Sequence, residues 1–220
     1  MIKLATAIEE ASWPYRFLRW IARVLVRLLT RTQVIGLENL PPSGAVLLVG
    51  NHLHMFDPPL ALAILPRRGT VFAADDWVNK PVIGHLIRWT GASIPVTRGE
   101  VDRRALSQAL EVLKQGGVLG IAPEGTRSKT GALQQAHSGV AFLATRSGAP
   151  IQLLAISGTE KAIAAWKRLR RPAIRVVFSE PFVLPGAPNK AKGEQLDAYT
   201  EDIMRRLAAL LPPEYRGVYG

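Results

Sequence analysis

Residues 45–65, AVLLVGNHLHMFDPPLALAIL, contain a strand, a polar turn and the beginning of a helix in immediate succession. The first six residues are apolar or glycine, which is typical of a strand that is covered on both faces. The turn carries His52, His54 and Asp57, and Pro58 suits the first position of a helix. A strand that passes through such a turn into a helix indicates an α/β fold, in which polar residues gather at the carboxyl ends of strands.

The rest of the chain repeats this alternation and predicts one α/β domain with a mixed, largely parallel sheet flanked by helices. The predicted strands are Ala45–Gly50, Val71–Ala74, Ser93–Val96, Val118–Ala122, Ile151–Ile156 and Ile174–Phe178. The predicted helices are Trp13–Leu29, Pro58–Leu65, Lys80–Thr90, Asp102–Lys114, Val140–Ser147 and Glu194–Leu211. With 220 residues, 48% of them hydrophobic, the chain suffices for one sizeable core.

The composition limits the kinds of ligand and of chemistry that the protein can have. The formal net charge is +11, which favours an anionic partner without choosing among nucleic acid, lipid headgroups and small phosphorylated substrates. The chain has no cysteine, so disulfides, thiolate metal sites and a cysteine nucleophile are excluded.

The segment Trp13–Leu29 is apolar but carries regularly spaced arginines. On a helix these arginines and Arg31 fall within an arc of about 120°, with leucines, isoleucine and phenylalanine opposite, so the pattern favours a helix lying in a membrane surface rather than crossing the membrane. A helix docked on its own domain with a solvated arginine face is the alternative, and one helix can serve both purposes. We expect residues 1–35 to form this membrane-associating region and residues 36–220 the remaining domain.

His52 and Asp57 are the candidate acid–base pair. A histidine at the end of a buried strand can act as a general base if a nearby carboxylate orients its ring and stabilises its protonated form. Two other interpretations stay open at this point: Asp57 serves only as a helix cap, or His52, His54 and Asp57 bind a metal ion.

Two further segments favour anion binding. Residues 123–128, PEGTRS, follow a predicted strand and combine the small Gly125 with the hydroxyl of Thr126 and the guanidinium of Arg127. Arg98 lies at the end of the strand region 91–98, GASIPVTR. Each segment alone is compatible with an ordinary turn.

Taken together, these motifs resemble the glycerolipid acyltransferase family, which includes 1-acylglycerol-3-phosphate and glycerol-3-phosphate acyltransferases. The resemblance rests on His-x4-Asp at residues 52–57, the segment 91–98, Pro-Glu-Gly-Thr-Arg at 123–127 and the block 150–153, PIQL, in the family's order. It spans residues 36–181. Leu153 replaces a proline that is common in the fourth block, and residues 73–76, AADD, lack a lysine that is common ahead of the second, so the acceptor is less firmly indicated than the chemistry.

The resemblance implies transfer of an acyl chain from acyl-CoA or acyl carrier protein to the free hydroxyl of a lysophospholipid, with 1-acylglycerol-3-phosphate as the leading acceptor and phosphatidic acid as the product. Another lysolipid or polar lipid is the alternative acceptor. His52 with Asp57 would be catalytic, Arg98 and Arg127 would hold the acceptor phosphate, and Glu124 with Gly125 and Thr126 would position the acceptor. No cofactor and no metal are implied.

These expectations place the protein on the cytoplasmic face of the cell membrane as a peripheral enzyme, in contact with anionic lipid. The basic stretch 161–175 would bind the acyl donor or lipid, or is simply solvated. Nucleic acid is not an expected partner, because no nucleic-acid-binding signature occurs. A metal-dependent hydrolase and a binding protein without catalysis are the remote alternatives.

Overall fold

The computed structural model describes residues 12–97, 102–184 and 191–220. Among them the strands are β1 (Arg31–Ile35), β2 (Val46–Gly50), β3 (Gly69–Ala74), β4 (Ser93–Val96), β5 (Val118–Ile121), β6 (Ile151–Ser157) and β7 (Ala173–Phe178). The helices are α1 (Trp13–Leu29), α2 (Asp57–Ile64), α3 (Asp75–Val78), α4 (Pro81–Thr90), α5 (Arg103–Lys114), α6 (Gly139–Ser147), α7 (Ala162–Lys167) and α8 (Glu194–Leu210). Short 3-10 turns are η1 (Leu37–Asn39), η2 (Thr159–Lys161), η3 (Pro213–Tyr215) and η4 (Gly217–Tyr219).

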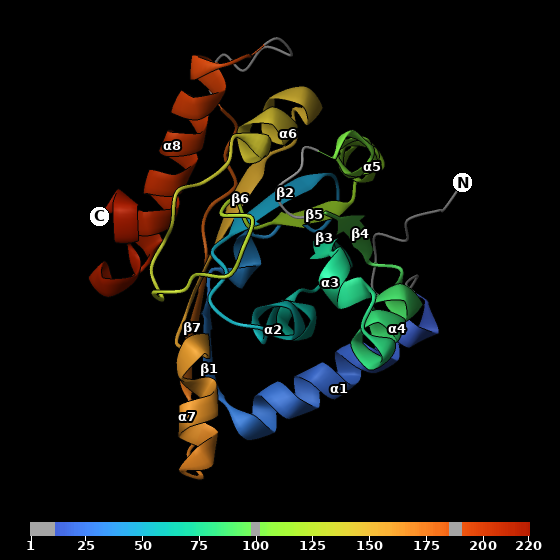
Figure 1. The fold of residues 1–220 in the computed structure, drawn as a ribbon, viewed down its shortest axis with the longest axis vertical. Helices are drawn as coiled ribbons and strands as arrows, with labels where there is room; N and C mark the ends of the chain where they lie inside the picture. Colours follow the sequence, from blue (N-terminus) through green and yellow to red (C-terminus); the bar gives the residue numbers. More distant parts are fainter. Residues whose placement is uncertain (1–11, 98–101, 185–190) are drawn as a thin grey trace.

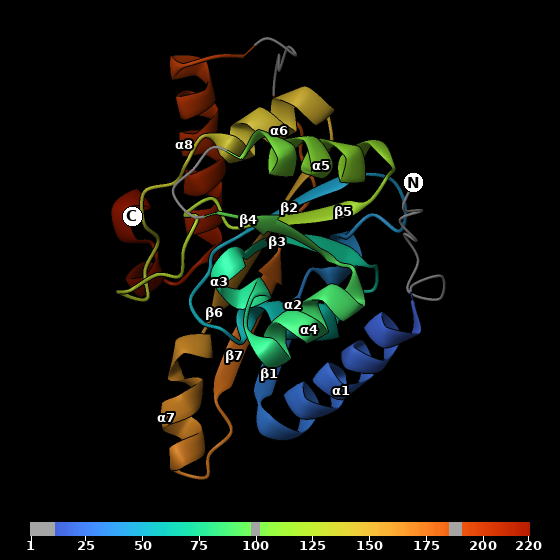
Figure 2. The same ribbon diagram turned by 45° about the vertical axis from the view of Figure 1, so that its right-hand side comes forward.

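The strands form a seven-stranded sheet in the order β1-β7-β6-β2-β5-β3-β4. All pairs are parallel except β6 with β7, so β7 and β1 run against the other strands. Helices α5, α6 and α8 cover one face and α1 to α4 lie on the other (Figure 1; Figure 2). The predicted α/β fold with a mixed, largely parallel sheet is therefore confirmed.

Strand β2 lies in the middle of this sheet and contributes to two hydrophobic cores. Leu47 and Val49 join the core beneath α5, α6 and α8, whereas Val46 and Leu48 join the core beneath α2. All four side chains are buried, as expected for a strand covered on both faces. Gly50 ends the strand where a Cβ would lie 2.9 Å from the carbonyl oxygen of Leu154 in β6, so its lack of a side chain lets the two strands approach.

Helix α1 has the predicted bounds, and two of its arginines bind the domain. Arg19 is buried and donates two hydrogen bonds to the carbonyl oxygen of Leu65, and Arg23 donates one to Ala63. Both carbonyls lie at the end of α2, where unpaired backbone oxygens attract cations. The alternative of a docked helix with a solvated arginine face is therefore wrong for Arg19, which is buried. Arg23 stays exposed, and the guanidinium groups of both residues hold α1 on the domain.

The outer side of α1 is apolar. Trp13 is 64% exposed, Trp20 62% and Leu28 63%, and Phe17 and Leu25 are exposed as well. The rings of Trp13 and Phe17 pack edge to face, and Trp13 packs in the same way on Trp89 of α4. No helix in the described ranges has both the length and the apolar character needed to span a bilayer.

Three helices or strands were not predicted: β1, α7 and the four-residue helix α3. Residues 31–35 were assigned to the membrane-associating region, but they form β1, which pairs with β7 at the edge of the sheet. The residues of β1 are largely exposed, and their sequence RTQVI lacks the apolar run that marks a buried strand. Helix α7 falls inside the basic stretch 161–175 and has only six residues, too few for a helical period to stand out.

Candidate functional site

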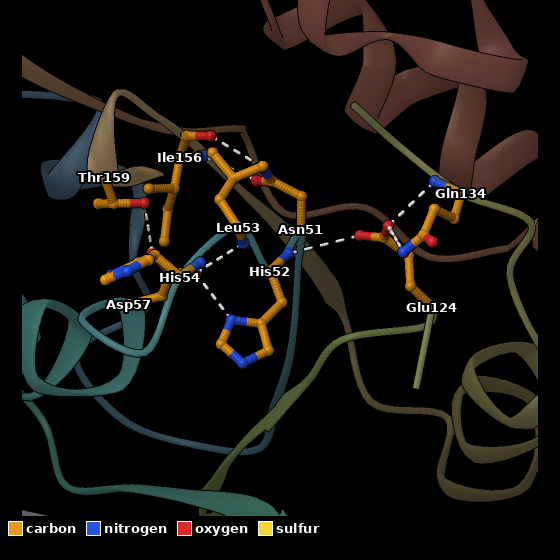
Figure 3. A network of polar contacts seen from close by, with 9 residues as sticks. All are labelled: Asn51, His52, Leu53, His54, Asp57, Glu124, Gln134, Ile156 and Thr159. Carbon is orange, nitrogen blue, oxygen red and sulfur yellow. Dashed lines mark hydrogen bonds and ion pairs between the residues drawn. The ribbon is translucent and has the colours of Figure 1, made fainter. Parts of the chain in front are cut away.

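The candidate site lies where β2 ends and α2 begins. Nδ1 of His52 lies 2.7 Å from Oδ2 of Asp57, so the two residues of the His-x4-Asp motif are in direct contact (Figure 3). Asp57 is buried, whereas His52 is partly exposed. The Nε2 atom of the ring points away from Asp57 (Figure 3). With Nδ1 donating to the carboxylate, Nε2 carries a lone pair and can accept a proton.

The carboxylate of Asp57 is held by three further donors. The backbone N–H groups of Leu53 and His54 donate to Oδ2 at 2.7 and 2.8 Å. The hydroxyl of Thr159, from the turn after β6, donates to Oδ1 at 2.6 Å, and Thr159 is fully buried. Asp57 is the first residue of α2, and its side chain accepts hydrogen bonds from the turn that precedes the helix. The carboxylate therefore both orients the His52 ring and fixes the conformation of this turn.

A side-chain clamp fixes the end of β2 to the neighbouring strand. The amide of Asn51 donates to the carbonyl oxygen of Ile156 and accepts from the N–H of the same residue, both at 2.8 Å. The carbonyl oxygen of His52 accepts from the N–H of Ser128 at 2.7 Å. The His52 backbone is therefore held between β6 and the segment 123–128.

Glu124 supports the site through hydrogen bonds to backbone N–H groups. It is buried; Oε1 accepts a long hydrogen bond of 3.4 Å from the N–H of His52, and Oε2 accepts one of 2.9 Å from the N–H of Gln134 (Figure 3). Burial raises the pKa of the carboxyl, and the hydrogen bonds from Gln134 and His52 partly offset this. Gly125 has φ +67°, where a side chain is strained, and a Cβ would lie 3.2 Å from the ring of His137.

The cation expected to hold phosphate lies beside an aromatic ring. The guanidinium carbon of Arg127 is 5.6 Å from the centre of the Trp77 ring, and Nζ of Lys80 is 4.2 Å from the same centre. Thr126 is exposed. Arg98 falls outside the described residues; Thr97, just before it, donates a hydrogen bond of 2.7 Å to Asp75.

His52, Asp57 and Glu124 thus come together at the carboxyl edge of the sheet, where sequence reasoning expected them, whereas the block 150–153 lies at the start of β6. Thr159, Asn51 and Lys80 were missed. Asn51 immediately precedes His52. A polar residue at the end of a buried strand needs a hydrogen-bond partner, so its position in the sequence could have indicated a structural role. Thr159 gave none, because its contact with Asp57 joins residues 102 positions apart. Lys80 lies outside the tetrapeptide 73–76 in which a lysine was sought, yet the fold brings it to the Trp77 ring that Arg127 also approaches.

The metal interpretation of the same turn finds no further ligands. Within residues 12–97, 102–184 and 191–220, no three His, Cys, Asp or Glu side chains are grouped so as to hold a metal ion. The arrangement provides a base with an oriented ring, which suits proton abstraction from a substrate hydroxyl.

Comparison with known proteins gives a consistent picture. A family model described as acyltransferase matches residues 31–157. The chain is 30% identical to a chloroplastic 1-acyl-sn-glycerol-3-phosphate acyltransferase of Brassica napus over 158 residues, which are 69% of this chain and 45% of that protein. It is 24% identical to the 1-acyl-sn-glycerol-3-phosphate acyltransferase of Bacillus subtilis (strain 168) over 197 residues, 89% of this chain and 96% of that protein.

A solved structure is also similar. The crystal structure of the 1-acyl-sn-glycerophosphate acyltransferase from Thermotoga maritima matches with a TM-score of 0.65 and 25% identity, over 87% of this chain and 77% of that one. The chain spans less than half of the Brassica napus protein and of its Arabidopsis thaliana counterpart, at 45% and 43% of their lengths. The similarity to the Bacillus subtilis protein, in contrast, extends over nearly the whole of that protein.

Proposed function

This chain belongs to the acyltransferase family, and we propose that it transfers an acyl chain from an acyl thioester to the free hydroxyl of 1-acylglycerol-3-phosphate, giving phosphatidic acid. The observation that carries the proposal is the 2.7 Å contact between His52 and Asp57 at the sheet's carboxyl edge. The relatives named for this activity supply the acceptor. The donor is an acyl-CoA or an acyl carrier protein, and no cofactor takes part.

The geometry suits direct transfer. Nε2 of His52 removes the proton from the acceptor hydroxyl as its oxygen attacks the thioester carbonyl. The tetrahedral intermediate then collapses, the carbon–sulfur bond breaks, and the protonated ring of His52 returns the proton to the leaving sulfur. Asp57 keeps Nδ1 protonated and stabilises the ring while it is charged. No enzyme nucleophile is required.

The acceptor phosphate would lie near Arg127 and Arg98, with Lys80 as a further cation beside Trp77. An arginine can contact two phosphate oxygens at once, and the ring of Trp77 limits the directions that both cations can take. Among the described residues, the hydrogen-bond donors to Glu124 are His52 and Gln134. Glu124 is therefore proposed to position the acceptor indirectly, by holding the backbone of His52.

The activity is tested by incubating the purified protein with labelled acyl-CoA and a panel of lysolipids, with and without EDTA. We expect acylation of 1-acylglycerol-3-phosphate that survives EDTA. His52→Ala and Asp57→Asn should each lower turnover by at least about 100-fold, the scale of general-base catalysis, with an unchanged circular dichroism spectrum. Turnover near that of the wild type in either variant would refute the mechanism; strict dependence on metal would favour a hydrolase.

The acceptor site is tested separately. We expect Arg127→Ala to raise KM for the phosphorylated acceptor by at least about tenfold, because one charged hydrogen-bonding group is lost, and to leave KM for the donor unchanged. An unaltered dependence of rate on acceptor concentration would show that Arg127 does not bind phosphate.

We further propose that α1 seats the protein on a membrane as a peripheral protein, on the cytoplasmic face. The exposed apolar side of the helix, with Trp13, Trp20 and Leu28, is the kind of surface that enters the headgroup region of a bilayer. Arg19 and Arg23 hold α1 on the domain, and the apolar side of the helix stays free to insert into the bilayer.

Flotation with liposomes tests this seating. Replacing Trp13, Phe17 and Trp20 with serine should reduce binding to vesicles by at least about tenfold, because three aromatic side chains leave the interface. The matched control replaces Trp77, an aromatic residue of α3, with serine. Equal loss in both variants, or none in the first, contradicts the proposal.

A further inference from the structure

An open pocket of about 530 Å³ lies at the junction of the α1 C-terminus, the α2 C-terminus and β1. We propose that it is a second lipid site that binds the phosphate headgroup of an anionic membrane phospholipid, separate from the site at His52. Six of the residues that line the pocket are Arg23, Arg27, Arg31, Arg171, Thr30 and Thr32. Four arginines line the pocket and no acidic residue does.

The arginines differ in how far they are engaged. Arg171 donates to the carbonyl oxygens of Thr30 and Arg27, and Arg23 uses Nε for Ala63, so both are fixed in place. In the part of the chain that the structure describes, the guanidinium groups of Arg27 and Arg31 have no hydrogen bond or ion pair, and both side chains are exposed. Their charges are therefore available to a ligand.

The hydroxyls in the pocket are arranged as a pair. Oγ1 of Thr30 lies 2.7 Å from that of Thr32, and Thr30 is buried with its Oγ1 also 2.6 Å from the carbonyl oxygen of Val26. Thr30 must donate to that carbonyl, so Thr32 donates to Thr30 and keeps lone pairs but no free proton. The anion is consequently bound by the arginines, and the threonines shape the floor of the pocket.

The surroundings point to a lipid rather than a soluble anion. Leu28 is 63% exposed and Leu29 43%, and both lie in the chain between the pocket residues Arg27 and Thr30, on the apolar side of α1 that is proposed to enter the bilayer. Helix α7 lies beside this end of α1 (Figure 1; Figure 2), with the Trp166 indole donating to the carbonyl oxygen of Leu29. A headgroup in the pocket would thus have its acyl chains next to exposed leucines, which a free phosphate would not use.

The pocket is distinct from the catalytic site, since none of its lining residues contacts His52 or Asp57. A phosphate monoester carries more charge than the diester of phosphatidylglycerol, so a cluster of arginines should prefer phosphatidate in the membrane. The inference rests on the proposed binding of α1 to the membrane. The experiment below gives different results if the lipid site is absent and if α1 does not bind membranes.

The test measures binding of the full chain to three kinds of vesicle: phosphatidylcholine alone, and phosphatidylcholine with phosphatidate or phosphatidylglycerol matched for surface charge. The pocket variant is R27Q/R31Q. The control, R103Q/R104Q, removes the same charge from exposed positions on α5, across the sheet. We expect the wild type to prefer phosphatidate, the pocket variant to lose at least about tenfold in binding to it, and the control to keep the preference.

Equal losses in the pocket and control variants would mean that net charge alone acts, and would overturn the proposal. So would a pocket variant that binds phosphatidate like the wild type. Inorganic phosphate at millimolar concentration should compete weakly; complete competition would assign the pocket to a free phosphate instead. Failure of the membrane seating itself would appear as no flotation of the wild type on any vesicle.

Discussion

At the scale of single residues, the carboxylate of Asp57 is the most constrained group in the site. Oδ2 accepts from the His52 ring and from two backbone N–H groups, and Oδ1 accepts from Thr159. These donors come from the turn after β2 and from the turn after β6, so the carboxylate is fixed by two strands that neighbour each other in the sheet. A carboxylate held in this way keeps the ring of His52 in one orientation.

Thr159 should accordingly act as a positioning residue. We expect Thr159→Val, which keeps the shape and removes the hydroxyl, to lower kcat by about tenfold while KM for donor and acceptor stays within about twofold, because the side chain touches neither substrate. Steady-state kinetics on both substrates measure this. Thr159→Ser restores the donor and should recover most of kcat; no recovery with serine would indicate a packing role instead.

Glu124 provides a test based on pH. Burial raises the pKa of Glu124 above the ordinary 4.5. At pH values between the pKa of the unfolded chain and the raised pKa of the folded protein, the folded protein therefore binds more protons than the unfolded chain. The free energy of unfolding consequently falls as pH rises through this window. Glu124→Gln removes this titration. We expect the stability of the variant relative to the wild type to increase as pH rises, measured by urea unfolding at a series of pH values. A difference that does not change with pH contradicts the expectation.

The site was predictable where its residues lie close in sequence. His52 and Asp57 are separated by one turn, and the proline after Asp57 already indicated that the chain turns between them. The roles of Glu124 and Thr159 were not predictable, because the first depends on the backbone of His52 coming within reach and the second on β6 lying beside β2. Strand order places these residues, and a sequence pattern does not contain it.

At the scale of elements, α1 packs on the domain through Tyr15, Arg19 and Ala22 and leaves several large apolar side chains exposed, which is unusual for a surface helix. Its amphipathic period was correctly predicted from the sequence. The sequence did not reveal that Arg19 and Arg23 donate to carbonyl oxygens at the end of α2, because this contact depends on where α2 ends in the fold. The same reasoning missed β1 and α7, which are short and exposed, since local periodicity needs length or burial to show.

The inner side of α1 gives a prediction about stability. Arg19→Ala removes two hydrogen bonds to the buried carbonyl of Leu65, and we expect it to lower the free energy of unfolding by about 1–3 kcal/mol. Arg16→Ala, at an exposed position of the same helix, should change it by less than about 0.5 kcal/mol. Urea unfolding of the three proteins compares them. Equal effects would show that Arg19 contributes nothing beyond its charge.

At the scale of the whole molecule, the first strand in the sequence closes one edge of the sheet. After α1 crosses the ends of α2 and α4, the chain enters β1, which pairs with β7, the last strand. The N-terminal elements are therefore part of the architecture as well as the proposed membrane contact. Tyr15 illustrates this: it is 2% exposed, and its hydroxyl accepts from the N–H of Gly69 at the start of β3.

Deleting residues 1–30 should consequently affect more than membrane binding. The deletion removes the buried ring of Tyr15 and the hydrogen bonds of Arg19, and loss of one buried aromatic side chain alone costs about 3–5 kcal/mol. We expect a markedly lower Tm in thermal unfolding, together with loss of flotation on vesicles. The serine variant of Trp13, Phe17 and Trp20 should lose flotation with little change in Tm, since these side chains are exposed. If the deleted protein kept the wild-type Tm, α1 would be a membrane anchor only, and its contacts with α2 and α4 would contribute nothing to the stability of the domain.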